Sequence, residues 1–203
     1  MQPSNCYKVK INFIRHGQTP SNHRHLYISS TDEDLSEEGI SELQNRSYPP
    51  CDLVFTSGFR RCNKTAEIIY KKNDIIEVPY FAELDFGNFE GKGYEDLKDN
   101  PLYRTWIDSR GILATPNGES RADFIERLKE GFSKVLEKSK GSKEISLVVH
   151  GGTIMGLISS YTDLDYYDVQ LKCGEYISCM VSFEEVNGNF FVSHFCIMDG
   201  GRA

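Results

Sequence analysis

Two short apolar runs of this sequence each end in the dipeptide His-Gly, and this feature constrains the fold most strongly. Residues 11–17 read Ile-Asn-Phe-Ile-Arg-His-Gly, and residues 148–152 read Val-Val-His-Gly-Gly. Apolar runs of this length are typical of buried strands. Parallel strands bring their carboxyl ends to one edge of a sheet, where ligands bind in open α/β folds. We therefore expect His16 and His150 to lie close together at such an edge, where the glycines let backbone N–H groups approach an anion.

Further apolar runs alternate with segments of helical character. Residues 52–56 and 75–78 predict short buried strands, and residues 60–72 between them predict a helix. A second helix is expected to follow the second His-Gly, at about residues 153–160. This alternation predicts an α/β fold, a three-layer α/β/α sandwich with a mostly parallel central sheet.

Helix caps and a turn signal complete the prediction of the elements. Ser36, followed by two glutamates, predicts a helix that runs to about residue 46. Ser120 begins a longer helix that Gly141 closes. Asn187-Gly188 separates two alternating segments and predicts a type I′ turn. The chain is therefore expected to end in an antiparallel hairpin.

The 203 residues fit one domain, 1–203, with an irregular insert at about residues 80–118. Long irregular segments inside compact domains are usually functional, so we interpret this one as a lid or specificity insert. Short helices are expected at 94–98 and 102–107. The rings of Tyr94, Tyr103 and Trp106 either contact the substrate or form a satellite core under the insert.

The formal net charge of -7 argues against nucleic acid or an anionic membrane as a partner. The six cysteines form no C-x-x-C pair, which favours reduced thiols. No segment approaches the roughly 20 apolar residues of a membrane span, and residues 1–10 contain no signal-peptide run. We expect a cytoplasmic protein that is a monomer or a homodimer.

Two arginines and a glutamate are further candidates for the site. Arg60 and Arg61 follow a predicted strand. The planar guanidinium group of arginine can donate hydrogen bonds to two phosphate oxygens at once. The start of a helix disfavours a cation, so an arginine pair there indicates that an anion is expected. Glu83 would serve beside a phosphate only if it held a proton, which requires a raised pKa.

The ordered motifs resemble those of the histidine phosphatase superfamily, the phosphoglycerate-mutase-like family, over nearly the whole chain. Gly58 stands where that family often has proline, Phe59 stands where leucine is common, and Asn117 stands where glycine is common. The matching segments are Arg-His-Gly-Gln-Thr at 15–19 with Asn22, Asp-Leu-Ser-Glu-Glu-Gly at 34–39, Thr-Ser-Gly-Phe-Arg-Arg at 56–61 with Thr65 and Ala66, Glu-Leu-Asp-Phe-Gly at 83–87, Phe-Glu-Gly at 89–91, Pro-Asn-Gly-Glu-Ser at 116–120, and Val-His-Gly-Gly at 149–152.

The resemblance implies a role for each matched residue. His16 is the nucleophile that becomes phosphohistidine, and Glu83 is the acid that protonates the leaving oxygen. Arg15, Arg61 and a protonated His150 hold the phosphoryl oxygens, with Arg60 as the alternative to Arg61. No metal and no cofactor is required, because these cations stabilise the charge. The expected substrate-binding residues are Gln18, Thr19, Asn22, Arg24 and Gly151.

Within the family, segments 85–91 and 118–120 resemble small-molecule phosphatases, especially the α-ribazole phosphatases of cobalamin assembly. Broad-specificity sugar-phosphate phosphatases share the pattern. The expected activity is therefore hydrolysis of a small phosphomonoester. Two alternatives remain open: a phosphoglycerate mutase, although those usually carry a longer insert before the second histidine, and a non-catalytic phosphate-binding module of the same fold.

Overall fold

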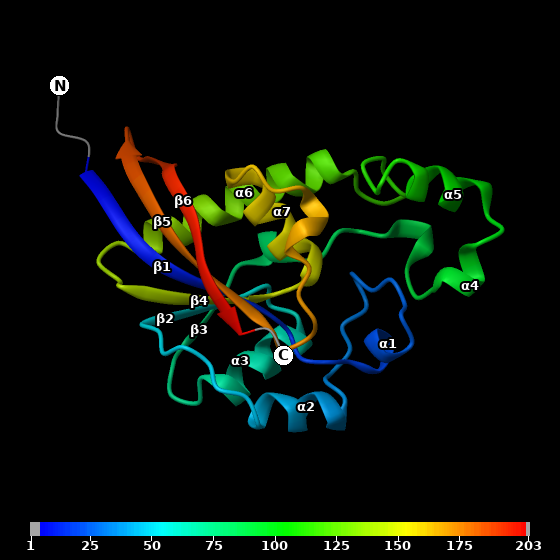
Figure 1. The fold of residues 1–203 in the computed structure, drawn as a ribbon, viewed down its shortest axis with the longest axis horizontal. Coiled ribbons are helices and arrows are strands. Elements are labelled where there is room, and N and C mark those ends of the chain that lie inside the picture. Colours follow the sequence, from blue (N-terminus) through cyan, green and yellow to red (C-terminus); the bar gives the residue numbers. More distant parts are fainter. Residues whose placement is uncertain (1–4, 202–203) are drawn as a thin grey trace.

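A six-stranded sheet forms the centre of the protein, whose structure is a computed structural model that describes residues 5–201. The predicted domain, 1–203, also includes residues 1–4 and 202–203, which lie outside the described residues. The strand order is β3-β2-β4-β1-β5-β6 (Figure 1). The strands are β1 (Asn5–Arg15), β2 (Leu53–Thr56), β3 (Ile75–Glu77), β4 (Glu144–Val149), β5 (Tyr176–Val186) and β6 (Asn189–Gly201).

The first four strands pair in parallel, and the last two add an antiparallel hairpin. At the turn of that hairpin Asn187 and Gly188 have φ values of 54° and 79°. Positive φ at both central residues is what a type I′ turn requires. The mostly parallel sheet and the terminal hairpin are therefore confirmed.

Helices cover both faces of the sheet, as Figure 1 shows. Helices α2 and α3 lie on one face, and α6 and α7 lie on the other. Side chains of β1 alternate between the two layers: Phe13 joins the large core cluster on the α6 side, and Ile14 joins the smaller cluster with Ala66 of α3. The three-layer sandwich is thus confirmed. The helices are α1 (Pro20–His23), α2 (Glu37–Gln44), α3 (Arg60–Ile69), α4 (Tyr94–Leu97), α5 (Pro101–Asp108), α6 (Arg121–Lys138) and α7 (Gly151–Tyr161), with 3-10 turns η1 (Pro79–Phe81), η2 (Gly87–Phe89) and η3 (Tyr166–Val169).

The predicted helix caps are present. Ser36 Oγ accepts a hydrogen bond from the N–H of Gly39 at 3.0 Å. Ser120 Oγ accepts one from the N–H of Asp123 at 3.2 Å. Each bond satisfies a backbone donor that the first helical turn leaves free. Helix α7 begins at Gly151, earlier than predicted, so His150 is its N-cap residue.

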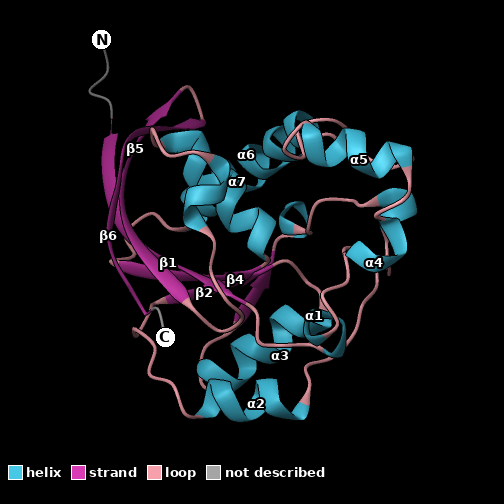
Figure 2. Cartoon of the chain, turned by 45° about the vertical axis from the view of Figure 1, so that its right-hand side comes forward, coloured by secondary structure: helices cyan, strands magenta, loops and turns pink. Residues whose placement is uncertain are grey.

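The insert at 80–118 is more regular than its glycines and prolines suggested. It carries α4 and α5, which lie at the end of the molecule away from the β5–β6 hairpin (Figure 2). Tyr103 and Trp106 of α5 are buried and pack against Phe89, whereas Tyr94 is exposed. Two of the three rings considered therefore belong to the core.

Of the three departures from the family pattern, Gly58 and Asn117 lie at positive φ, whereas Phe59, where the family commonly has leucine, has φ -68°. Gly58, just before α3, has φ +88°, and Asn117 has φ 59°. The ring of proline fixes φ near about −65°, so proline could not adopt the conformation at position 58. Asparagine tolerates the left-handed region better than most residues. The loop before α3 consequently has a shape that requires glycine.

Candidate active site

His16 and His150, which directly follow strands β1 and β4, meet at the carboxyl edge of the sheet. Strands β1 and β4 are neighbours, with Arg15 paired to Val149. The N–H of His16 continues this pairing by donating to the carbonyl of Val149 at 2.9 Å. The ring centroids of His16 and His150 are 5.3 Å apart. The expected proximity of the two residues is therefore confirmed.

His16 is buried, and its hydrogen bonding determines which ring nitrogen is free. Nδ1 lies 2.8 Å from the carbonyl oxygen of Gly17. A carbonyl only accepts hydrogen bonds, so Nδ1 carries the hydrogen and Nε2 keeps its lone pair. Burial, followed by the charges of Arg61 and Arg15, holds the pKa of His16 well below its usual range. The fold thus favours the neutral imidazole, in which Nε2 keeps its lone pair.

His150 has the opposite arrangement. Arg61 Nε donates to His150 Nδ1 at 3.3 Å, so the hydrogen of the neutral ring is on Nε2, which lies 2.9 Å from Ser57 Oγ. Burial and Arg61 lower the pKa of His150 well below its usual range. The protonated His150 expected from the resemblance is therefore not the form that its protein neighbours favour. The charge of a phosphoryl dianion acts in the opposite direction and would raise this pKa.

The two adjacent arginines of α3 have different environments. The side chain of Arg61 is 1% exposed, lines the cavity described below, and donates to the carbonyls of Ser29 and Thr31 at 3.1 and 2.8 Å. Arg60 is exposed and pairs with Asp34 at 3.0 Å. The geometry therefore favours Arg61 over Arg60 as a phosphate ligand.

Arg15, at the end of β1, lies beside His16 in the same wall. Its Nη1 donates to the carbonyl of Leu171 at 2.6 Å, which fixes the guanidinium. Its Nε is buried and has no hydrogen-bond partner among the described residues. A Cβ at Gly151 would lie 3.4 Å from the guanidinium carbon, so glycine leaves this side of the arginine open.

Glu83 follows η1 and contacts the start of α7. Its two carboxyl oxygens accept hydrogen bonds from the N–H groups of Leu84 and Gly152, each at 2.9 Å. A Cβ at position 152 would overlap this carboxyl group, so glycine allows Glu83 to lie directly against the start of α7. Burial raises the pKa of Glu83 against the opposing effects of these N–H groups and of the arginines. The raised pKa favours the protonated form of Glu83, which the proposed acid role beside a phosphate requires.

The remaining predicted binding residues divide into two groups. Thr19, Asn22 and Gly151 line the cavity, and Asn22 Oδ1 accepts from the N–H of Thr19 at 3.3 Å. That contact orients the amide and leaves Nδ2 without a hydrogen bond to any described residue. Gln18 and Arg24 do not line the cavity: the Gln18 amide lies 3.4 Å from His23 Nδ1, and Arg24 is exposed. Their expected substrate contacts find no support in the geometry.

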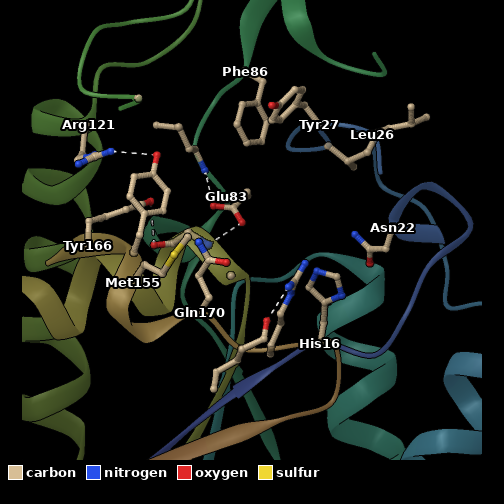
Figure 3. Close-up of a pocket in the computed structure, with 18 of the residues that line it drawn as sticks. His16, Asn22, Leu26, Tyr27, Glu83, Phe86, Arg121, Met155, Tyr166 and Gln170 are labelled. Carbon is tan, nitrogen blue, oxygen red and sulfur yellow. Dashed lines mark hydrogen bonds between the residues drawn. The ribbon is translucent and has the colours of Figure 1, made fainter. Parts of the chain in front are cut away.

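The predicted site residues that line the cavity surround one end of it, which we call the phosphate end. They are Arg15, His16, Thr19, Asn22, Arg61, Glu83 and Gly151, and the cavity has a volume of about 580 Å³. In Figure 3, His16 and Asn22 border one end, and Tyr27, Phe86 and Leu26 border the other. Trp106 lines this cavity, whereas Tyr94 and Tyr103 do not. The side chains beyond the phosphate end are mostly apolar or aromatic and include Leu26, Tyr27, Ile28, Leu84, Phe86, Trp106, Ile107, Met155, Tyr166, Tyr167 and Leu171, with Glu33, Arg110, Arg121 and Gln170 among them.

Sequence reasoning did not identify several of these wall residues. Met155 lies one turn into the helix that follows Gly151, so its place near the second His-Gly could have been recognised from helical spacing. Tyr166 is held by a donated hydrogen bond to the carbonyl of Gly152 at 3.4 Å and by the guanidinium of Arg121, 4.1 Å from its ring centre. No local pattern marks Tyr166 or Arg121.

A buried histidine with a lowered pKa, two arginines and a carboxyl group with a raised pKa lie together at the edge of the α/β sheet, an arrangement suited to phosphoryl transfer. The chain belongs to the histidine phosphatase superfamily (branch 1), whose sequence model matches residues 11–189. The expected family and the expected enzyme class, a phosphatase, are confirmed.

Known relatives and solved structures agree with this assignment. The chain is 26% identical over 159 residues to the adenosylcobalamin/alpha-ribazole phosphatase of Salmonella typhimurium, covering 74% of this chain and 78% of that protein. It is 30% identical over 161 residues to the phosphoglycerate mutase of Schizosaccharomyces pombe, covering 71% and 75%. The crystal structure of the alpha-ribazole phosphatase from Shigella flexneri superposes with a TM-score of 0.76 at 22% identity, covering 94% and 95% of the two chains.

Residues 5–201 lack two features, a membrane-spanning helix and a cluster of metal ligands. No helix in this part of the chain is long and apolar enough to cross a membrane. Within the same residues, no group of three or more histidine, cysteine, aspartate or glutamate side chains is placed to hold a metal ion.

Proposed function

We propose that the protein is a metal-independent phosphomonoester hydrolase that acts through a phosphohistidine intermediate on a small phosphorylated metabolite. One observation carries this proposal: His16 lines the cavity together with Arg15 and Arg61, and its Nδ1 is bonded to the Gly17 carbonyl, which leaves Nε2 directed to no described hydrogen-bond partner. The two fixed guanidinium groups supply positive charge where a phosphoryl group would lie, so the reaction needs no metal ion.

The first step transfers the phosphoryl group to the enzyme. His16 Nε2 attacks phosphorus, and a bond forms between nitrogen and phosphorus as the ester P–O bond breaks. Glu83 gives its proton to the departing alcohol oxygen and becomes a carboxylate. Arg15, Arg61 and Asn22 Nδ2 stabilise the phosphoryl oxygens, and His150 holds the guanidinium of Arg61 in place.

The second step returns the enzyme to its starting state. A water molecule attacks phosphorus while the Glu83 carboxylate takes one of its protons. The bond between nitrogen and phosphorus breaks, which releases inorganic phosphate and neutral His16. Glu83 is protonated again and is ready for the next substrate.

The substrate that we favour is α-ribazole 5′-phosphate or another phosphate ester with a nucleoside-like alcohol. The relatives named alpha-ribazole phosphatase support this choice, and so does the aromatic wall of Tyr27, Phe86 and Trp106 beyond the phosphate end. Flat groups pack well against such rings. A role in cobalamin biosynthesis in the cytoplasm follows from the same proposal.

A phosphoglycerate mutase is the second candidate, because one relative at 30% identity carries that name. A mutase keeps its phosphoenzyme and returns the phosphoryl group to a phosphoglycerate. Its activity would depend on a bisphosphate primer. A phosphatase needs no primer and releases inorganic phosphate.

A kinetic panel in EDTA tests the proposal. The substrates are p-nitrophenyl phosphate, α-ribazole 5′-phosphate, sugar phosphates and 3-phosphoglycerate, with phosphate release as the readout. We expect turnover without metal, with the largest kcat/KM on α-ribazole 5′-phosphate. Interconversion of phosphoglycerates that requires 2,3-bisphosphoglycerate would favour the mutase. No turnover of any ester would favour a non-catalytic binding module.

A further inference from the structure

Three buried polar side-chain atoms have no hydrogen-bond partner among residues 5–201, and all three belong to residues that line the same cavity. They are Arg15 Nε, Glu33 Oε1 and Trp106 Nε1. Leaving a buried polar atom without a partner is energetically unfavourable, so each such atom calls for an explanation. A phosphoryl oxygen would satisfy Arg15, but Glu33 is a hydrogen-bond acceptor with no role in the mechanism above.

Glu33 lines the cavity and is connected to residues near its phosphate end. Its Oε2 accepts a hydrogen bond from Ser21 Oγ at 2.9 Å, and Ser21 directly precedes Asn22. Two residues before Glu33, the carbonyl of Thr31 accepts from Arg61. Glu33 is therefore linked to residues of the phosphate end in two ways, by the hydrogen bond between its carboxyl group and Ser21 and by the backbone that leads to Thr31.

No cation of the described chain neutralises Glu33. It forms no ion pair with a described residue, whereas Arg110, another wall residue, pairs with Asp165 at 2.9 Å. Glu83 differs as well, because two backbone N–H groups occupy its oxygens. Glu33 is thus the cavity carboxyl group with an oxygen still available to accept a hydrogen bond.

We propose that Glu33 determines specificity by accepting a hydrogen bond from a hydroxyl or ammonium group on the alcohol part of the substrate. The same carboxylate repels an alcohol that carries its own carboxylate. The preferred substrates are then phosphate esters of polyhydroxylated or amino alcohols without an acidic group. This inference rests on the proposed hydrolase function and narrows its substrate class.

The test uses four small phosphate esters that differ in one group: ethyl phosphate, 2-hydroxyethyl phosphate, 2-aminoethyl phosphate and 3-phosphonooxypropanoate. For each ester, kcat/KM is measured for the wild-type protein and for Glu33→Gln. The ratio of the two values cancels differences in leaving-group reactivity. Glu38→Gln removes an exposed carboxylate outside the cavity and is the matched control.

We expect Glu33→Gln to lower kcat/KM about tenfold or more on 2-aminoethyl phosphate, since hydrogen bonds between charged groups are the strong ones. The loss on 2-hydroxyethyl phosphate should be smaller, because the amide oxygen of glutamine still accepts. Ethyl phosphate should change less than about twofold, and the carboxylate ester should improve several-fold. Glu38→Gln should leave all four values unchanged.

A second variant separates recognition from local packing. If Glu33 only orients Ser21, then Ser21→Ala should reproduce the effect of Glu33→Gln, and the proposal would be overturned. An equal change of kcat/KM on all four esters in Glu33→Gln would overturn it too. If the wild-type protein hydrolyses neither the four esters nor p-nitrophenyl phosphate, the proposed hydrolase function itself is wrong. Thermal unfolding of each variant verifies that the fold is retained.

Discussion

At the scale of single residues, the site depends on hydrogen bonds that give its two histidines opposite tautomers. Gly17 holds the hydrogen of His16 on Nδ1, and Arg61 directs that of His150 to Nε2. Both side chains are buried and have lowered pKa values. The protein thus keeps a free nucleophilic nitrogen on one ring and a fixed support for the arginine on the other.

The lowered pKa of His16 predicts how stability depends on pH. In the unfolded chain this histidine takes up a proton below about pH 6.5, whereas in the fold it stays neutral. The unfolded state then binds more protons, so the free energy of unfolding falls as pH falls from about 6.5 toward the folded pKa. Between pH 7 and 5 this contribution reaches up to about 2 kcal/mol.

Denaturant unfolding of the wild-type protein and of His16→Gln at both pH values measures this contribution. The variant should lose less stability on acidification, by up to about 2 kcal/mol. His23→Gln, which removes an exposed histidine, should keep the wild-type dependence. Identical slopes for wild-type protein and His16→Gln would show that His16 is not held neutral.

The neighbouring arginines of α3 allow a matched comparison. Arg61→Lys keeps the charge, but one ammonium group cannot replace a guanidinium that contacts Ser29, Thr31 and His150 together. We expect kcat/KM on p-nitrophenyl phosphate to fall about 10²–10³-fold in this variant. Arg60→Lys should change it less than about twofold. A larger loss in Arg60→Lys would reverse the assignment.

The proximity of the two histidines could be predicted because it follows from a general property of parallel strands. The resemblance already favoured Arg61 over Arg60, and the burial of Arg61 in the structure supports that preference. Glu33 was missed because it stands between Asp32 and Asp34, and nothing local distinguishes one acid of that run from another.

At the scale of elements, α5 is the helix of the insert that reaches the cavity. Its buried side, with Tyr103 and Trp106, belongs to the main core cluster. Ile107 lines the cavity and is 46% exposed, so its truncation should not disturb that core. The helix therefore serves as core on one side and as wall of the leaving-group end on the other.

Ile107→Ala should weaken the binding of large substrates. We expect KM for α-ribazole 5′-phosphate to rise about 3–10-fold, since the lost methyl groups correspond to about 1 kcal/mol or more of apolar contact. KM for ethyl phosphate, which is too small to reach α5, should stay the same. Leu102→Ala, at a position of the same helix that is 59% exposed and outside the cavity, is the control. Equal effects of the two substitutions would exclude α5 from substrate binding.

The elements themselves were largely predictable because their signals are local. Capping serines, the Asn187-Gly188 turn and the apolar runs each act within a few residues. The start of α7 was misplaced because Gly151 and Gly152 are poor helix formers. Their place in the helix depends instead on a distant contact, the carboxyl group of Glu83 against the N–H of Gly152.

At the scale of the whole molecule, the sheet brings together segments that are far apart in the chain. The order β3-β2-β4-β1-β5-β6 puts β1 and β4 side by side in the interior, and this order could not be predicted from local patterns. The cavity wall draws on six separate regions, around residues 15–33, 61, 83–86, 106–121, 151–155 and 166–171. Its phosphate end was predictable from motifs, whereas its leaving-group end depends on long-range packing. The expectation of a monomer or homodimer stays a prediction.

The central claim is that His16 carries the phosphoryl group during turnover. The most direct measurement incubates the protein in EDTA with a ³²P-labelled phosphomonoester, quenches within the first turnover and follows label bound to protein. We predict a label that is labile in acid and stable in alkali, as expected for phosphohistidine. It should map to a peptide containing His16 and be absent in His16→Ala. Turnover at the wild-type rate in His16→Ala, or label on another residue, would contradict the account.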